Sequence, residues 1–333
     1  MAKKITIKKG QLGLVAKAGD YYRVLEAGEH RLGWFNTDDV LVVSQDGSEV
    51  PGALADYLRR FQPDWVARYC LAVDLTADEI GVLSNNGVLQ EIVPPSTRRL
   101  YWQQDAALTL QRIDTRDVRV PVDVMNAALQ PRRNGALKGR DAMLVVQVPA
   151  WHVGVVKIDG EIQALLPPGL TAYWKINHLV EAEIVDTRLQ VVEVSGQEIL
   201  TKDKVNLRLN LAANWRYSDV LQACGQLTKP LEHLYRELQF ALREAVGTRT
   251  LDELLEDKQI IDEVVSKQVQ GRLSSFGMEI ASLGVKDIVL PGDMKTILSR
   301  LVEAEKSAQA NVIRRREETA ATRSLLNTAK GME

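Results

Sequence analysis

The residue types that most often carry out chemistry are scattered along this sequence. It has four histidines, which show no HxxxH spacing and no neighbouring cysteine: His30, His152, His178 and His233. Isolated histidines of this kind make a poor metal site. Cys70 and Cys224 lie far apart and form no CxxC motif, so neither a disulfide framework nor a cysteine-built zinc site is expected. We therefore predict no metal and no cofactor.

Motifs of nucleophilic and nucleotide chemistry are also absent. The sequence contains no GxSxG, Walker or GxGxxG motif. Asp114 and Asp186 begin two matching Asp-Thr-Arg triplets, and a neighbouring arginine can shift the pKa of a carboxylate. Because the triplet recurs within a repeat, we interpret it as a turn or a strand-edge salt bridge. The chain is predicted not to be an enzyme, with a hydrolase or hydrolase subunit as the weaker alternative.

One unit of sequence occurs three times along the chain. Its copies span residues 12–34, 80–102 and 153–174. In each copy a second glycine follows the first six positions later: Gly13 and Gly19, Gly81 and Gly87, Gly154 and Gly160. Each copy ends on a tryptophan: Trp34, Trp102 and Trp174. A tryptophan that recurs at one position of a β-module is more often a core or interface residue than part of a ligand box.

The repeated unit is predicted to be a small antiparallel β-meander. An apolar strand such as residues 153–156 runs into an Asp-Gly pair, which is a signal for a tight hairpin. A return strand ends at Pro-Pro-Gly or an equivalent turn, and a third strand carries the tryptophan. We predict β-rich repeat module 1 over residues 1–75 and module 2 over residues 76–148.

The third copy continues into a larger domain that mixes strands and helices. Residues 205–217 alternate strictly between apolar and polar side chains, which indicates a long half-buried strand. Amphipathic helices follow, one of them after a capping box that starts at Thr250, and a last strand ends at Pro291. Apolar residues at helical spacing also occur between residues 52 and 70, in an insert that follows the first copy. The predicted fold class is α+β, with this third domain over residues 149–291.

Residues 292–333 are expected to form one long helix. From Met294 to Lys330 there is no proline or glycine, and alanine, glutamate, lysine and arginine dominate. Such a helix is roughly 50 Å long, and with its narrow apolar stripe it is marginal alone in water. We expect it to pack laterally on copies of itself as the start of a coiled coil. The candidate contact residues are Leu298, Leu301, Val302, Val312 and Ile313.

Four short segments in the C-terminal half match sequences of one known family. They are QEILTKDKV at residues 197–205, LREAVG at 242–247, VKDIVLP at 285–291 and EAE at 303–305. Together they resemble the stomatins and slipins, prohibitin-like proteins of the SPFH or band 7 superfamily. The resemblance covers about residues 150–330, and modules 1 and 2 are interpreted as two extra N-terminal half-repeats. The hydrophobic hairpin that the family carries at its N-terminus is missing from this sequence.

The resemblance implies a non-enzymatic, oligomeric scaffold. Members of this family form rings or cages at membranes and organise lipid or protein partners, so we expect a homo-oligomer that organises membrane-associated assemblies. An NfeD-type membrane protein is the partner that the resemblance implies in bacteria. Lys3, Lys4, Lys8 and Lys9 could contact anionic lipid at a membrane surface. Solvated strand ends are the alternative, which short basic clusters favour.

The rival hypothesis comes from a different functional class. It is a monomeric or dimeric adaptor whose three modules each bind a partner protein, without forming large rings. Nucleic-acid binding is not expected, because the basic run at residues 314–316 is flanked by glutamates. Mixed charges on a long helix suit interhelical salt bridges better than phosphate contacts, and no aromatic platform accompanies them.

Composition and hydropathy set the expected location. The net charge of -2 and the pI of about 6.2 give no general attraction to nucleic acid or acidic lipid. No stretch reaches the roughly 18 apolar residues of a spanning helix, and the N-terminus lacks the apolar region of a signal peptide. We therefore expect a cytoplasmic chain, peripheral to the inner face of a membrane, with no transmembrane segment or signal peptide.

Overall fold

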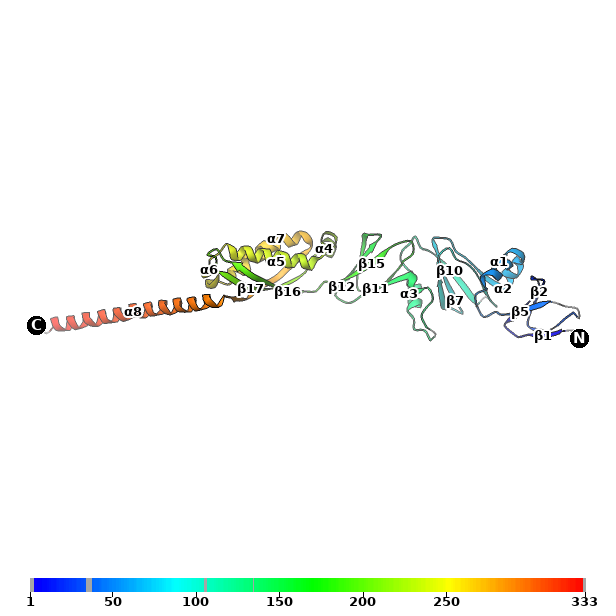
Figure 1. Cartoon of the computed structure of the whole chain (residues 1–333), viewed down its shortest axis with the longest axis horizontal. Helices are drawn as coiled ribbons and strands as arrows, with labels where there is room; N and C mark the ends of the chain where they lie inside the picture. Colours follow the sequence, from blue (N-terminus) through cyan, green and yellow to red (C-terminus); the bar gives the residue numbers. More distant parts are fainter. Residues whose placement is uncertain (1–2, 34–37, 105–106, 134, 332–333) are drawn as a thin grey trace. The chain divides into compact units, whose positions relative to one another are not determined.

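Groups of strands are separated by short helices in the computed structural model of Figure 1, which describes residues 3–33, 38–104, 107–133 and 135–331. Contacts within the chain divide it into one compact unit over residues 1–185 and another over residues 186–333. We name these the N-terminal unit and the C-terminal unit. The domain boundaries proposed from the sequence, after residues 75, 148 and 291, stay predictions.

The described residues of the N-terminal unit include three successive sets of five strands. The first set comprises β1 (Lys3–Ile7), β2 (Gln11–Lys17), β3 (Asp20–Leu25), β4 (Gly28–Leu32) and β5 (Asp39–Ser44). The second comprises β6 (Cys70–Asp74), β7 (Glu79–Asn85), β8 (Val88–Val93), β9 (Arg98–Trp102) and β10 (Leu108–Asp114). The third comprises β11 (Met143–Val148), β12 (His152–Ile158), β13 (Glu161–Leu166), β14 (Gly169–Trp174) and β15 (Val180–Asp186).

All three sets have the same strand pairing, so the prediction of three repeated β-rich modules in an α+β chain is confirmed at the level of the fold. The second strand of each set pairs with the third and the fifth, and the first pairs with the fourth. The predicted meander is wrong, because the tryptophan strand pairs with the strand that precedes the repeat. Trp174, for example, lies opposite Met143. A turn residue with positive φ directs the fourth strand away from the hairpin: Gly28, Ser96 or Gly169.

Two glycine positions explain why the unit recurs. The first glycine lies in the second strand, where a Cβ atom would come within 2.9–3.0 Å of an apolar side chain in all three copies: Gly13, Gly81 and Gly154. The second glycine closes the hairpin and follows a residue that also has positive φ: Ala18 and Gly19, Asn86 and Gly87, Asp159 and Gly160. Two consecutive residues with positive φ are typical of the type I′ turn, whose twist matches that of the flanking strands.

Short helices cover the cores of the N-terminal unit. They are α1 (Gly52–Phe61), α2 (Pro63–Tyr69), α3 (Val122–Leu129) and the 3-10 turn η1 (Arg140–Ala142). The segment between residues 52 and 70, where helical spacing was predicted, therefore forms two helices. Trp102 packs with α1 and Trp174 with α3, and both are buried. A core role of the repeated tryptophan is thus confirmed at these two positions, whereas Trp34 lies outside the described residues.

The C-terminal unit is a three-stranded antiparallel sheet with helices on one face. Its strands occur in the order β16 (Gln190–Leu200), β17 (Asn206–Tyr217) and β18 (Met278–Val289). They are accompanied by α4 (Val220–Gln226), α5 (Pro230–Gly247), α6 (Leu251–Glu256), α7 (Gln259–Leu273) and the 3-10 turn η2 (Ser274–Phe276). The long helices α5 and α7 lie side by side over the sheet (Figure 1).

Alternation along β17 builds the core of the C-terminal unit. Leu207, Leu209 and Leu211 are almost fully buried beneath the helices, while the residues between them are exposed. The half-buried strand predicted from residues 205–217 is therefore confirmed. The predicted capping box is also present, because the Thr250 side chain accepts from the Glu253 backbone N–H and the Glu253 side chain accepts from the Thr250 N–H.

The chain ends in α8 (Gly292–Lys330), an uninterrupted helix of 39 residues. At 1.5 Å per residue it is about 58 Å long. The long C-terminal helix predicted from composition is confirmed. Among the described residues, no helix combines the length and the apolar character that crossing a membrane requires.

Candidate assembly surface

The histidines and cysteines do not converge on a reactive centre in the described part of the chain. No group of three His, Cys, Asp or Glu residues lies close enough there to hold a metal ion. His178 pairs instead with the hairpin residue Asp159, at 2.7 Å between Nδ1 and Oδ2. Burial raises the pKa of the Cys70 thiol to about 12, so the nucleophilic thiolate is scarce near neutral pH.

The Asp-Thr-Arg triplets are strand-end salt bridges, as predicted. Arg116 donates through its side chain to both carboxylate oxygens of Asp114, and its backbone N–H also donates to Asp114 Oδ1 at 2.9 Å. Arg188 makes the same three contacts with Asp186. Each aspartate is the last residue of its strand, β10 or β15. The triplet therefore closes the end of its strand with a local salt bridge.

Replacing Arg116 with glutamine is expected to raise the pKa of Asp114. Hydrogen bonds from the Arg116 side chain and backbone hold this pKa at about 2, below its usual value of 3.8. A depressed carboxylate pKa stabilises the folded state above pH 3.8, and that contribution disappears as the pH falls toward 2. An NMR titration of the Asp114 carboxyl checks this, with Arg112→Gln as a control at an exposed position of the same strand. An unchanged Asp114 pKa in Arg116→Gln would contradict the assignment.

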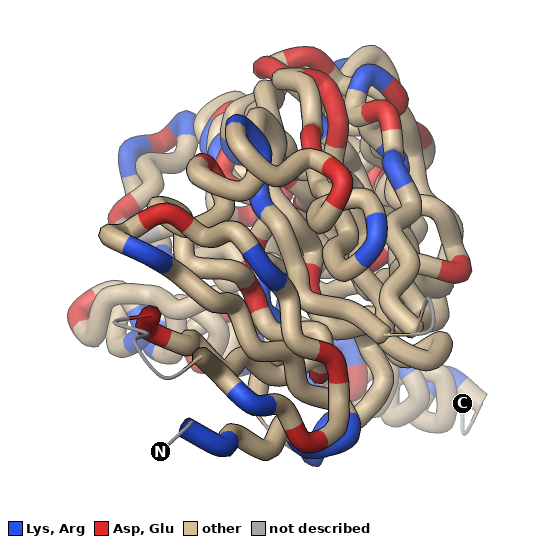
Figure 2. Tube along the Cα trace, turned by 90° about the vertical axis from the view of Figure 1, so that its right-hand side faces the viewer, with Lys and Arg blue, Asp and Glu red and all other residues tan. Residues whose placement is uncertain are grey.

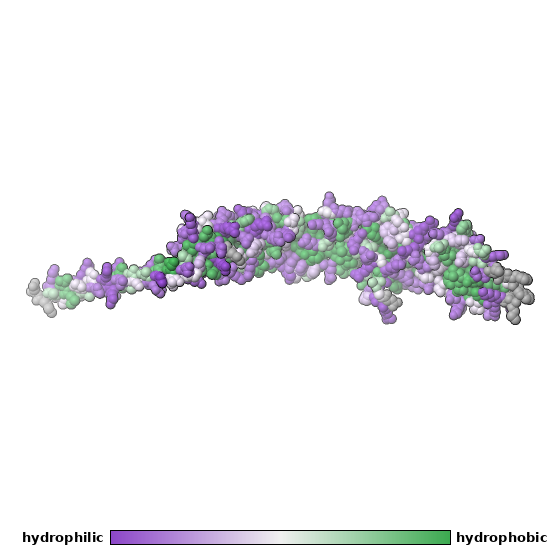
Figure 3. Space-filling model, viewed as in Figure 1, coloured by the Kyte–Doolittle hydropathy of each residue, from purple (hydrophilic) through white to green (hydrophobic). Residues whose placement is uncertain are grey.

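The five residues predicted to carry lateral contacts do not share one environment. Leu298 is half-buried and packs, with Met294, against the core of the C-terminal unit. The other four are exposed: Leu301 by 54%, Val302 by 45%, Val312 by 52% and Ile313 by 58%. Every described residue of α8 from Leu301 onward is exposed. Figure 3 shows apolar and hydrophilic residues intermixed on the surface of this helix.

Most of the exposed aliphatic residues of α8 form one stripe. With about 100° of rotation per residue, the five predicted positions fall within roughly 120° of the helix circumference. Leu326, which is 58% exposed, falls on the same side but was missed because four turns of polar sequence separate it from Ile313. Leu325 lies on the other side of the helix. We name the stripe formed by Leu301, Val302, Val312, Ile313 and Leu326 the aliphatic seam.

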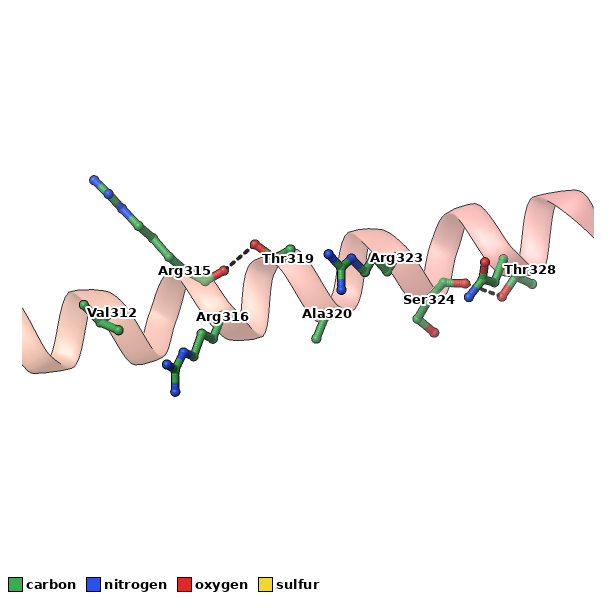
Figure 4. A pocket seen from close by; sticks show the side chains of 9 residues that line it. Val312, Arg315, Arg316, Thr319, Ala320, Arg323, Ser324 and Thr328 are labelled. Carbon is green, nitrogen blue, oxygen red and sulfur yellow. Dashed lines mark hydrogen bonds between the residues drawn. The ribbon is translucent and has the colours of Figure 1, made fainter.

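The C-terminal part of the seam borders an open groove on α8. Val312, Arg316, Ala320 and Ser324 are among the residues that line it. Figure 4 shows Arg315 and Arg316 extending in different directions, with the small side chains of Ala320 and Ser324 on the following turns. Small side chains allow close approach of a second helix. Arg316 lies on the same face as Ala320 and Ser324, so its charge would have to meet an acidic group or solvent at that contact.

Charges of both signs accompany the seam. Arg314, Arg315 and Arg316 are followed by Glu317 and Glu318, and all five are exposed. In the part of the chain that the structure describes, no ion pair joins two side chains of α8. Figure 2 shows basic and acidic residues interspersed over the parts of the trace that face the viewer. The charges of α8 are thus available to opposite charges on a neighbouring helix.

Comparison with known proteins identifies the C-terminal half. The model of the SPFH domain / Band 7 family matches residues 146–319, just over half of the chain. The chain belongs to the SPFH domain / Band 7 family. The match begins within β11 and ends inside α8, so it includes the last β-set, the sheet and helices of the C-terminal unit, and most of the seam. The first two β-sets lie outside it.

Sequence similarity to individual proteins extends over a similar portion of the chain. The chain is 29% identical over 165 residues to a stomatin homolog of Pyrococcus horikoshii, which covers 50% of this chain and 61% of that protein. It is 27% identical over 141 residues to stomatin of Mus musculus, which covers 42% of this chain and 50% of that protein. Mechanosensory protein 2 of Caenorhabditis elegans is 29% identical over 146 residues, covering 44% and 30%. The resemblance to stomatins seen in the sequence is confirmed.

Proposed function

We propose that this Band 7 protein is a non-enzymatic scaffold that assembles laterally through α8 and organises protein or lipid assemblies at a membrane. The observation that carries the proposal is the aliphatic seam, which lies open to solvent along a helix of 39 residues. A long helix with no packed face is marginal in water, and most helical stability in proteins comes from burial of an apolar face. Contact with a second copy would supply that burial.

The free energy gained by burying the seam favours contacts among several subunits over contact within a single pair of helices. Full burial of an aliphatic side chain is worth about 1.5–3 kcal/mol, and the seam residues are already half-covered, so each gains about half of that. Two facing seams together gain on the order of 10 kcal/mol, against an association cost of about 4–15 kcal/mol. One helix pair is therefore close to balance. In a ring each subunit has two neighbours, so a second surface of the subunit would have to supply the contact that the seam does not.

The non-enzymatic part of the proposal rests on the side chains already described. The Cys70 thiol is buried, the Asp-Thr-Arg carboxylates bind their own arginines, and His178 is paired with Asp159. Membrane association, cytoplasmic location and an NfeD-type partner are proposed from membership in the Band 7 family and from similarity to stomatins. The chain spans 61% of the Pyrococcus horikoshii relative, so none of these properties carries over to it directly.

A second candidate function has one structural observation in its favour. Each three-stranded sheet of the N-terminal unit has two outer strands, such as β13 and β15 around β12. An outer strand offers unpaired backbone groups to which an extended peptide can add. The adaptor hypothesis therefore assigns partner binding to these sheets and needs no assembly through α8.

Sedimentation velocity and light scattering on the full chain separate the two functions. The scaffold is expected to have a mass several times the 37.1 kDa of one chain at micromolar concentration. Flotation of the same protein with liposomes is expected to bring the assembly to the membrane fraction. A single 37.1 kDa species across the micromolar range would overturn the scaffold and leave the adaptor.

A further inference from the structure

A basic pocket in the N-terminal unit lies apart from the seam. It has a volume of 470 Å³ and lies between the β7–β8 hairpin, the end of α3 and the segment that follows α3. Small-molecule sites commonly have about 300–1,000 Å³, so one ligand of modest size fits. Val88, Leu89 and Ala127 give the pocket apolar walls, and Arg132, Arg133 and Lys138 provide its charges. Among the residues that the structure describes, no acidic side chain lines it.

The two arginines have no acidic partner among the described residues. Arg132 is half-buried, and its Nε atom is buried without a hydrogen-bond acceptor. A buried guanidinium N–H that makes no hydrogen bond is costly, so an acceptor is expected in this position. Arg133 is exposed at the rim. The pocket thus combines an unsatisfied inner donor with a free outer cation.

Lys138 adds a third positive charge that is only loosely held. Its Nζ atom is 3.5 Å from Glu91, but Arg99 binds the same Glu91 oxygen at 2.8 Å. Glu91 therefore keeps a closer partner when Lys138 turns to a ligand. The C-terminal end of α3, which borders the pocket, carries at most about half a negative charge from the helix dipole. The three positive side chains outweigh it.

The part of the wall that carries Lys138 is held against β8 by its backbone. The Ile92 backbone N–H donates to the Lys138 carbonyl at 3.0 Å, which fastens the segment to β8. Gly139 has a φ of +81°, and a Cβ atom there would lie 2.0 Å from the Ile92 carbonyl oxygen. Only glycine permits this approach. A preformed wall lowers the entropy cost of binding.

We propose that this pocket binds a phosphate monoester, carried either by a lipid headgroup or by a soluble molecule. The planar guanidinium of arginine can donate two parallel hydrogen bonds to the oxygens of a phosphate. Three positive charges in a pocket with no acidic lining residue among those described favour a ligand with a charge near −2 over a single carboxylate. The apolar walls accept the organic part next to the phosphate. The proposal goes beyond the scaffold role and does not depend on assembly through α8.

Binding to the full chain tests the proposal. The soluble probes are inorganic phosphate and glycerol phosphate, followed by calorimetry, and the lipid probe is phosphatidylcholine vesicles with and without phosphatidic acid. The variant Arg132→Gln/Arg133→Gln is compared with Arg23→Gln/Arg112→Gln, which removes two exposed charges from other strands of the same unit. We expect about tenfold weaker binding for each pocket arginine removed and no change in the control.

Each outcome decides the proposal. Selective binding of either probe supports it, and the probe that binds identifies the source of the phosphate. Arg133→Gln alone, at an exposed position, should weaken binding about tenfold with an unchanged circular dichroism spectrum. The proposal is overturned if no phosphate probe binds, if the two double variants lose affinity equally, or if a glutamate-rich peptide binds as tightly as the phosphate monoester.

Discussion

Replacement of Leu301 and Val312 by glutamate is expected to convert the assembled protein into a monomer of 37.1 kDa. Both side chains are about half-exposed in the single chain, at 54% and 52%, so the fold of one subunit does not require them. In a lateral contact the new carboxylates would lie in an apolar interface and face their own copies, which combines desolvation with like-charge repulsion. Light scattering at micromolar concentration measures the change.

The matched control places the same two charges elsewhere on the helix. Ser307 and Ala321 are exposed and lie on the side of α8 opposite the seam. Ser307→Glu/Ala321→Glu should therefore keep the mass and the circular dichroism of the wild-type assembly, whereas the seam variant should lose part of the helical signal of α8. If the wild type, the seam variant and the control have equal masses, α8 is not the element through which the subunits assemble.

Leu298 makes a poor test of assembly, although the sequence placed it in the same stripe. Because it packs against the core of the C-terminal unit, a charge there would disturb the fold of the subunit as well as any contact between subunits. A loss of mass in a Leu298 variant could then come from unfolding. Leu301 and Val312 avoid this ambiguity.

Trp174→Ala is expected to destabilise the N-terminal unit by about 3–5 kcal/mol, the usual cost of truncating a buried tryptophan. Trp174 is 0% exposed and lies in a cluster with Val124 and Met125 of α3 and with Met143 of β11. Removing the indole leaves a cavity at the junction of the second and third β-sets. Urea unfolding followed by circular dichroism gives the free energy, and hydrogen exchange of the β11 and β14 amides localises the loss.

Trp151→Ala is the control for this substitution. Trp151 has the same side chain but is 69% exposed, at the turn between β11 and β12. Its replacement should change the free energy of unfolding by less than about 1 kcal/mol. Equal losses in the two variants would contradict the assignment of Trp174 to the core.

The sequence was sufficient for those features that depend on neighbouring residues. The second glycine of the repeat sits at a tight turn, a demand that acts within a few residues of the glycine itself, and its spacing from the first glycine can be read directly from the sequence. Alternation along β17, the capping box at Thr250 and the run without proline or glycine in α8 are local in the same sense. Band 7 membership also followed from short contiguous segments.

Only the tertiary structure decided which distant elements meet. The partner of β14 is β11, because the chain turns away from the hairpin at Gly169, and no periodicity within either strand reveals that choice. Leu298 and Leu301 belong to one stripe in sequence, yet the sheet and helices of the C-terminal unit cover the first and leave the second exposed. The basic pocket joins the β7–β8 hairpin to α3 and the segment that follows it, which lie far along the chain from the hairpin. Such contacts depend on packing between elements, which a local pattern does not encode.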